Sequence, residues 1–113
     1  MLIYSNQLIF FNLNIIKMTN KNKLANKIKV ENMISTNGNK IANQFILYTD
    51  KGVYFQSYES IIAFQNMGKI ILDSYYWNYS RTTSKYRNIF LGMTTAEVKK
   101  RIKEGSIKLT NLN

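Results

Sequence analysis

Apolar and polar positions alternate along several short stretches in the middle of the chain, and turn-forming residues separate them. An alternation with a period of two is typical of a β-strand that buries one face. Residues 27–34 show it. Residues 41–49 and 53–58 are instead runs rich in β-branched and aromatic residues, which also favour strands, and Asp50-Lys51-Gly52 separates them. A short link that ends in glycine is typical of a β-hairpin, because glycine adopts the positive φ of the turn. We therefore predict a hairpin formed by 41–49 and 53–58.

A second hairpin is predicted from residues 60–64 and 69–73, which flank the sequence QNMG. The glycine of this link again suits a tight turn. A short helix at 58–65 is the alternative, because the apolar residues of that stretch do not alternate cleanly. The chain has no proline, so every predicted strand can lie inside a sheet.

The pattern changes after Asp73. Residues 74–80, SYYWNYS, place their odd-numbered aromatic residues on one face if the segment is extended. Residues 82–92 then predict a helix that Gly92 ends. Either Thr82 or Thr83 caps its start. Its apolar stripe, with a spacing of three and four residues, comprises Tyr86, Ile89 and Phe90.

Residues 94–105 predict a second helix, which begins with a capping box of Thr94 and Glu97 and ends at Gly105. Residues 106–112 suit a short closing strand. Strands followed by two helices and one more strand indicate the α+β class. The predicted fold is a mainly antiparallel sheet of four to five strands, with the two C-terminal helices packed on one face.

The first residues differ from the rest. Residues 1–17 are apolar but carry Asn and Gln, and they are too short and too polar to span a bilayer. A polar run follows Met18 and has the character of a natural N-terminus. We therefore expect a single domain over 24–113. Residues 1–23 are expected to be an extension, which contributes an edge strand, or an upstream start.

Composition narrows the function. The chain has 113 residues, no cysteine and no histidine, so it lacks thiolate metal ligands, disulfides and the commonest general base. The six acids are scattered, and only Glu59 and Asp73 have no predicted structural role. We expect no enzymatic activity, no cofactor, no metal and no membrane partner. The absence of cysteine also fits a cytoplasmic setting.

The net charge of +10, from 16 Lys and Arg against 6 Asp and Glu, favours an anionic partner. Lys, Asn and Ile are abundant throughout, as AT-rich coding produces. The positive charge alone therefore does not show whether the chain binds nucleic acid or is rich in lysine only because its coding sequence is AT-rich.

The densest candidate site is 77–88, WNYSRTTSKYRN, which has aromatic, hydroxyl and cationic residues and no acid. Exposed rings stack on nucleic-acid bases, and cations contact phosphates. The alternative is that the rings belong to the core and the threonines are ordinary helix caps. The last helix adds cations that either contact phosphate or form a solvated face. The candidate binding residues are Tyr75, Trp77, Tyr79, Arg81, Lys85, Arg87, Lys99, Lys100 and Arg101.

Between Ile41 and Asn113, the motifs NQF, GVYFQSY, IIAF, GKIILD, YWNYSRTTSKYRNIFLG and KKRIKEGSIKLTNLN resemble a family of small proteins encoded by bacteriophages and related mobile elements. The family is of unknown function and brings no catalytic residues. Asn78 stands where the family suggests an Asp, which weakens a carboxylate role there. The resemblance implies a phage accessory protein in the cytoplasm of a bacterial host.

By analogy with other phage proteins of this size, we expect an inhibitor of a host nucleic-acid-targeting defence complex, as anti-CRISPR proteins are. The expected partner is a host nucleoprotein complex. The alternatives are a direct, weakly sequence-specific DNA- or RNA-binding protein and a small structural protein that forms homo-oligomers.

Overall fold

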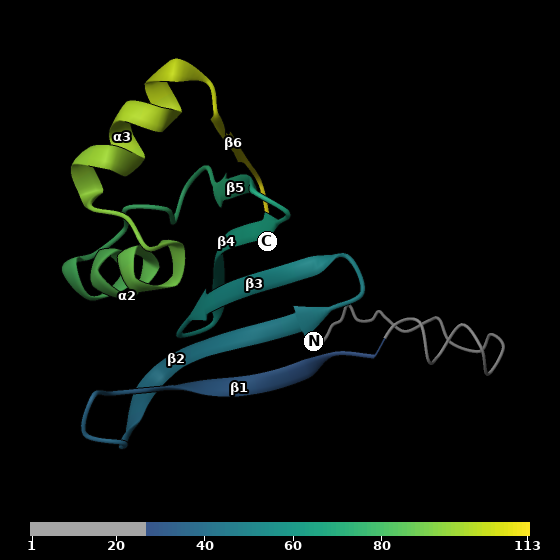
Figure 1. Cartoon of the computed structure of the whole chain (residues 1–113), viewed down its shortest axis with the longest axis vertical. Coiled ribbons are helices and arrows are strands. Elements are labelled where there is room, and N and C mark those ends of the chain that lie inside the picture. The colour runs from purple at the N-terminus through teal and green to yellow at the C-terminus, as the bar shows by residue number, and fades with distance from the viewer. Residues whose placement is uncertain (1–26) are drawn as a thin grey trace, which may run out of the picture.

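The computed structural model describes residues 27–113, which form a twisted sheet and two helices (Figure 1). The sheet is formed by β1 (Lys29–Ile34), β2 (Lys40–Thr49), β3 (Gly52–Ser57), β4 (Ser60–Asn66), β5 (Lys69–Asp73) and β6 (Ile107–Thr110). The helices are α2 (Arg81–Leu91) and α3 (Thr95–Glu104). The predicted α+β class is confirmed. The predicted extension over 1–23 lies outside the described residues.

The sheet has six strands in the order β1-β2-β3-β4-β5-β6. The prediction of four to five strands was therefore too low. Each of the first five strands pairs antiparallel with the next, whereas β6 runs parallel to β5. A parallel neighbour needs a crossover connection, and α2 and α3 provide it. The sheet is therefore mixed, with a meander of five strands and one parallel edge.

The hairpin of β2 and β3 matches the prediction. Gly52 has a φ of 149°, and it pairs with Thr49 across the turn. A Cβ atom at Gly52 would lie 2.6 Å from the ring of Phe64 and 2.9 Å from the carbonyl of Gln65. Position 52 therefore requires glycine both for its backbone conformation and for the close approach of β4.

The segment at 58–65 contains a turn and the strand β4, so the alternative prediction of a helix there was wrong. Phe55 of β3 pairs with Ala63, but the next residue, Gln56, pairs with Ile61. Ile62 is the extra residue of a β-bulge, and its side chain is buried. A bulge adds one residue to a strand and so breaks its period of two, which explains why the apolar residues of this strand do not alternate.

The caps of the helices match the predictions in part. Ser80, rather than Thr82 or Thr83, is the N-cap of α2, and its side chain accepts from the backbone N–H of Thr83. Gly92 ends α2 as predicted. The capping box of Thr94 and Glu97 and the terminal Gly105 are confirmed in α3.

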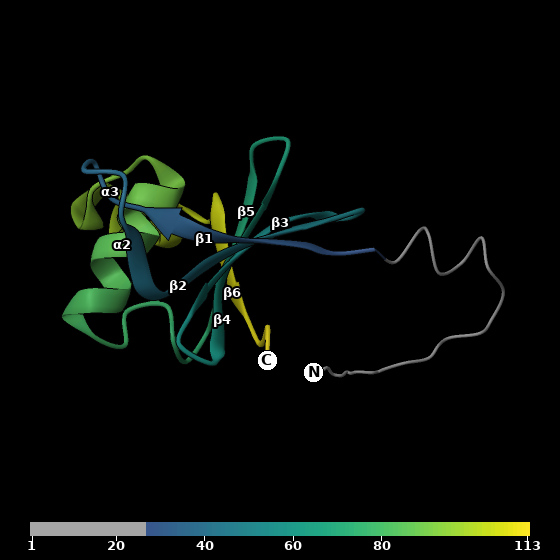
Figure 2. The same cartoon turned by 90° about the horizontal axis from the view of Figure 1, so that it is seen from below.

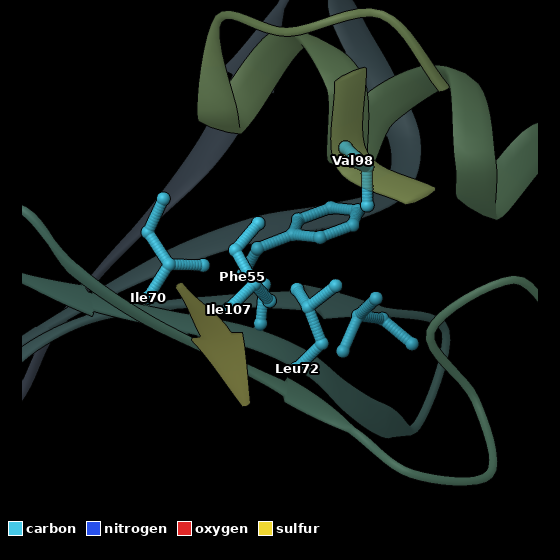
Figure 3. Close-up of a cluster of buried hydrophobic side chains, with 7 residues drawn as sticks. Phe55, Ile70, Leu72, Val98 and Ile107 are labelled. Carbon is cyan, nitrogen blue, oxygen red and sulfur yellow. The ribbon is translucent and has the colours of Figure 1, made fainter. Parts of the chain in front are cut away.

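The hydrophobic core lies between one face of the sheet and the helices (Figure 3). Phe55 is at its centre, and its ring stacks on Phe90 of α2 with centroids 5.8 Å apart. Ile89 was predicted to share the stripe of Phe90 but is 57% exposed. The fully or nearly fully buried apolar side chains are Phe55, Ile62, Ala63, Ile70, Leu72, Val98 and Ile107.

Both helices lie on the same side of the sheet, as the view from below shows (Figure 2). Helix α2 contacts β3 and β4, and α3 contacts β6. The prediction that the two helices pack on one face is therefore confirmed. Among residues 27–113, no helix has the length and apolar character to cross a membrane.

Candidate nucleic-acid interface

The aromatic segment after β5 is a turn and not an extended strand. Residues 74–78 fold back on themselves, and the backbone N–H of Trp77 donates to the carbonyl of Asp73 over 3.1 Å. One carboxylate oxygen of Asp73 also accepts from the N–H groups of Tyr75 and Tyr76, at 3.0 and 2.8 Å. The expected alternation of faces therefore does not apply to this segment.

The turn gathers three tyrosine rings. Tyr76 lies edge-on to Tyr75 at 4.7 Å and to Tyr79 at 5.4 Å, and the rings of Tyr75 and Tyr79 are 6.0 Å apart. Tyr75 is 71% exposed and Tyr79 is 63% exposed. Tyr76 is half-buried and packs against the core. The structure thus leaves Tyr75 and Tyr79 available to stack on a ligand, as the binding hypothesis requires.

Trp77 has a structural role instead. Its ring is half-buried against the core, and the guanidinium of Arg87 lies over it at 5.4 Å. Of the two interpretations of Trp77, the structure fits that of a core residue and not that of an exposed stacking surface.

The side chain of Arg87 is fully buried, which contradicts its expected position at the surface. Its guanidinium donates to the carbonyl oxygen of Trp77 at 2.6 Å and to Oδ1 of Asn78 at 3.2 Å. It also donates twice to Oδ1 of Asn88, at 3.2 and 2.8 Å, and to Oγ1 of Thr95 at 3.1 Å. Five hydrogen bonds use the five N–H donors of an arginine. Arg87 therefore joins the aromatic turn to α2 and to the start of α3 and contacts no solvent.

No carboxylate accompanies this buried cation among its hydrogen-bond partners. Burial lowers the pKa of Arg87 from its usual value, although a guanidinium remains charged in proteins. The sequence carried only a weak signal of this role. Thr83 and Arg87 are four residues apart, and residues 78, 88 and 95 are uncharged hydrogen-bonding residues, but the burial of Thr83 and Arg87 on α2 became known only from the structure.

Arg81 and Lys85 are exposed on α2, the helix that follows the aromatic turn. Arg81 is the first residue of α2, whose first turn contains no acid. The ammonium group of Lys85 lies 5.3 Å from the ring of Tyr86. From Ser74 to Ala96 the chain contains no acid at all, so the charged side chains of this segment are all positive.

The three candidate cations of α3 differ in their exposure and in their contacts. Lys99 and Lys100 are exposed, and Lys100 is within 4.0 Å of Glu104. The guanidinium of Arg101 donates to Oγ of Ser106 at 3.1 Å and contacts the sulfur of Met93 at 3.7 Å. Arg101 thus helps to hold the turn between α3 and β6. Among the described residues, no hydrogen bond, ion pair or ring contact joins these three cations to the aromatic turn.

A pocket of about 460 Å³ lies beside Tyr79, and nothing in the sequence pattern predicted it. Two of its lining residues, Ser57 and Thr83, are joined by a buried hydrogen bond of 3.1 Å between their hydroxyls. Tyr58, in the turn between β3 and β4, borders it and has a φ of 57°. Within residues 27–113, no three His, Cys, Asp or Glu side chains gather in a possible metal site. The pocket is lined by Asn43, Ser57, Tyr58, Glu59, Ser60, Ile62, Tyr76, Tyr79, Ser80 and Thr83.

A comparison with protein-family models matches residues 28–105 to a family described as "Family of unknown function (DUF8033)". The chain belongs to this family. No curated protein matches significantly, and no solved structure does either. The DUF8033 match covers β1 to β5, the aromatic turn and both helices but not β6, and its description states neither an activity nor an origin.

Proposed function

We propose that this DUF8033 protein is a non-enzymatic binding protein that contacts single-stranded nucleic acid through Tyr75, Tyr79, Arg81 and Lys85. The observation that carries the proposal is the pair of exposed tyrosine rings, 6.0 Å apart, on a segment without acids. A base–aromatic stack contributes about 1–3 kcal/mol, and it tolerates any base because every base has a π-face.

The charge of the chain supports an anionic partner. Only two ion pairs form among residues 27–113, Lys29 with Glu31 and Lys100 with Glu104. Arg81 and Lys85 are therefore not neutralised by a neighbouring carboxylate, and each can contact a phosphate. Contacts of this kind release counterions, so binding should weaken steeply as salt is added.

The pocket beside Tyr79 suits the base or the sugar of a nucleotide. Its volume falls within the range of small-molecule sites. Seven of its ten lining residues carry a hydroxyl group, and Glu59 also lines it. A carboxylate repels phosphate but accepts hydrogen bonds from amino and hydroxyl groups. We therefore place a base or a sugar at the pocket and the phosphates on Arg81 and Lys85.

An absence of enzymatic activity is part of the proposal. Glu59 and Asp73 were the acids without a predicted structural role, and the carboxylate of Asp73 accepts four hydrogen bonds in the structure.

An inhibitor of a nucleic-acid-targeting complex in the cytoplasm of a bacterial host is one form of the same function. It would compete for the guide or target strand with the same residues.

The test is a titration of fluorescent single-stranded RNA and DNA oligonucleotides at several salt concentrations, followed by anisotropy. The double variant Tyr79→Ala/Lys85→Ala should bind about tenfold or more weakly. The slope of its log affinity against log salt concentration should become shallower by about 0.7–0.9, the contribution of one phosphate contact. The matched control is Tyr48→Ala/Lys51→Ala. It removes the same two side-chain types from the β2–β3 hairpin and leaves the aromatic turn and α2 unchanged. It should bind within about twofold of the parent.

Two results would overturn the proposal. One is a failure of the parent chain to bind either oligonucleotide at low salt. The other is an equal loss of affinity in the test and control variants, which would show that only net charge matters.

A further inference from the structure

The described residues that line the pocket beside Tyr79 include one charged side chain, that of Glu59, and no cation. Glu59 is exposed in the turn between β3 and β4. Neither of the two ion pairs among residues 27–113 involves it, and the side-chain hydrogen bonds around this turn use Gln56 and Ser57 instead. Within the described residues, both carboxylate oxygens of Glu59 are therefore available to a ligand in the pocket.

The backbone at the pocket adopts an uncommon conformation at two positions. Asn43 and Tyr58 both line the pocket and have positive φ values of 64° and 57°, which residues other than glycine rarely adopt. Tyr58 is the first of two residues between the paired Ser57 and Ser60. The backbone N–H of Tyr58 donates to the carbonyl of Asn43 over 2.7 Å. Unfavourable backbone conformations gather at ligand sites in folded proteins, and here they fix the turn that carries Glu59.

Hydrogen-bonding capacity is also left unused next to the pocket. Gln44 is the strand partner of Ser57, so the two side chains lie on the same face of the sheet. The side chain of Gln44 is fully buried, and neither its Nε2 nor its Oε1 atom has a hydrogen-bond partner among the described residues. Buried amides without partners are rare in folded proteins. A pocket in such surroundings is suited to a polar ligand rather than an apolar one.

The carboxylate of Glu59 can select among the bases, because an ionised carboxylate has hydrogen-bond acceptors and no donor. Guanine alone of the standard bases has two neighbouring N–H donors on its Watson–Crick edge, at N1 and N2. Adenine and cytosine place a ring-nitrogen acceptor beside their amino group, and uracil and thymine place their single N–H between two carbonyls. Those acceptors would meet a negative charge, whereas guanine donates to both oxygens in the paired geometry that makes such bonds strong.

We infer that the pocket binds guanine and that Glu59 is the residue that recognises this base. The inference rests on the proposed binding of single-stranded nucleic acid, and it adds a preference for one base of the strand. The guanine lies against Tyr79 with its Watson–Crick edge toward Glu59. Tyr75, which does not line the pocket, stacks on another base without preference, and the phosphates lie on Arg81 and Lys85.

The experiment compares three fluorescent oligonucleotides that differ at one central position of an otherwise uniform uridine strand. The base at this position is guanine, uracil, or hypoxanthine, which is guanine without the N2 amino group. The parent chain should bind the guanine strand about tenfold more tightly than the uracil strand, with the hypoxanthine strand between them. A single guanine in each strand prevents the four-stranded structures that guanine-rich strands form.

Glu59→Gln replaces one acceptor oxygen with an NH₂ donor, which opposes a donor of guanine. The ratio of the guanine-strand affinity to the uracil-strand affinity should fall to within about twofold of one. This ratio is the measurement because the loss of any acid raises the affinity for every strand. Glu31→Gln is the matched control. It makes the same change on β1, at another exposed glutamate, and should keep the ratio of the parent.

The outcomes separate this inference from the proposed function. If no strand binds at low salt, both fail. If the parent binds all three strands equally, or if Glu59→Gln keeps the preference for guanine, the inference fails and the proposed function stands. An equal loss of the preference in Glu31→Gln also contradicts the inference.

The sugar is the other part of a nucleotide that a carboxylate can bind, and the same strands made as DNA distinguish it from the base. The preference for guanine should be equal in RNA and DNA, because both donors belong to the base. A preference that disappears without the 2′-hydroxyl would assign Glu59 to the sugar and overturn the inference.

Discussion

Arg87 links three segments through side-chain and backbone oxygen atoms, without a carboxylate. The partial negative charges of one carbonyl, two amide oxygens and one hydroxyl replace the counter-ion. The stack on Trp77 adds an interaction with the face of the ring. Only the planar fork of an arginine can reach all of these acceptors at once. The residue therefore determines how the aromatic turn lies on α2.

We predict that Arg87→Lys lowers the free energy of unfolding by about 2–4 kcal/mol, because it leaves buried acceptors unpaired. Urea unfolding followed by the fluorescence of Trp77 measures this directly. Lys85→Met is the control, because Lys85 is exposed on the same helix, and it should change the stability by less than about 0.5 kcal/mol. A similarly small effect of Arg87→Lys would contradict the assigned role.

Asp73 joins the end of β5 to the C-terminal residues. One of its carboxylate oxygens accepts from the backbone of Leu112 at 2.8 Å and from the side chain of Asn113 at 3.0 Å. Burial by itself would raise the pKa of Asp73, but the hydrogen bonds from Leu112, Tyr76, Asn113 and Tyr75 outweigh it. The pKa is therefore held below its usual value, and the folded state binds the proton less readily than the unfolded chain.

The sign of the pH dependence follows from this lowered pKa. The stabilisation by Asp73 is fully present above the unfolded pKa of about 3.9, and it is lost as the pH falls through the folded pKa. We predict that the free energy of unfolding decreases between pH 5 and pH 3, and that Asp73→Asn makes the decrease smaller. Urea unfolding at pH 5 and at pH 3 tests this. If the free energy of unfolding falls by the same amount in Asp73→Asn as in the parent, other acids cause the pH dependence.

The exposure of single side chains in the candidate site was beyond the reach of the sequence. Tyr75, Trp77 and Tyr79 were assigned to one face of a strand, whereas the turn separates Trp77 from the other two. The hydrogen bonds from Asp73 that form this turn depend on the position of its carboxylate in the folded chain. Of the candidate cations on α2, Arg81 and Lys85 are exposed, whereas Arg87, which the helix period had also placed with its charge in water, is buried.

Short turns connect the strands of the meander, and two of them place a residue other than glycine at positive φ. Tyr58 has a φ of 57°, and Met67 has a φ of 50° before Gly68 at 85°. Positive φ at both central residues is the conformation of a type I′ turn, in which Asn-Gly is the preferred pair. Met67 is 98% exposed, so its side chain gains nothing from packing to compensate for its conformation.

We predict that Met67→Asn raises the free energy of unfolding by about 0.5–1 kcal/mol, because asparagine tolerates the left-handed conformation. Met67→Val is the matched comparison. It should destabilise the protein, because a branched Cβ is unfavourable at positive φ. Thermal unfolding of both variants gives the answer, and equal midpoints would mean that the turn is not formed as described.

The elements were predicted where one local signal was sufficient. The β2–β3 hairpin and the caps of α3 depend on residues close together in the sequence, and both are confirmed. The bulge at Ile62 and the parallel pairing of β6 depend on distant neighbours. The number of strands was accordingly underestimated, since no local pattern states which strands share a sheet.

At the scale of the whole molecule, the two helices pack on the face of the sheet that buries the core. They carry seven of the Lys and Arg residues, and Arg87 is the only one of the seven that is buried.

The order of the strands in the sheet is also their order in the chain, and this has a consequence for synthesis. Each of the first five strands meets its partner as soon as both have left the ribosome. The sixth can pair with β5 only after the two helices that precede it have been made. We expect nascent chains to hold a paired but unfinished sheet, which is completed when β6 pairs with β5 and residues 112 and 113 bond to Asp73.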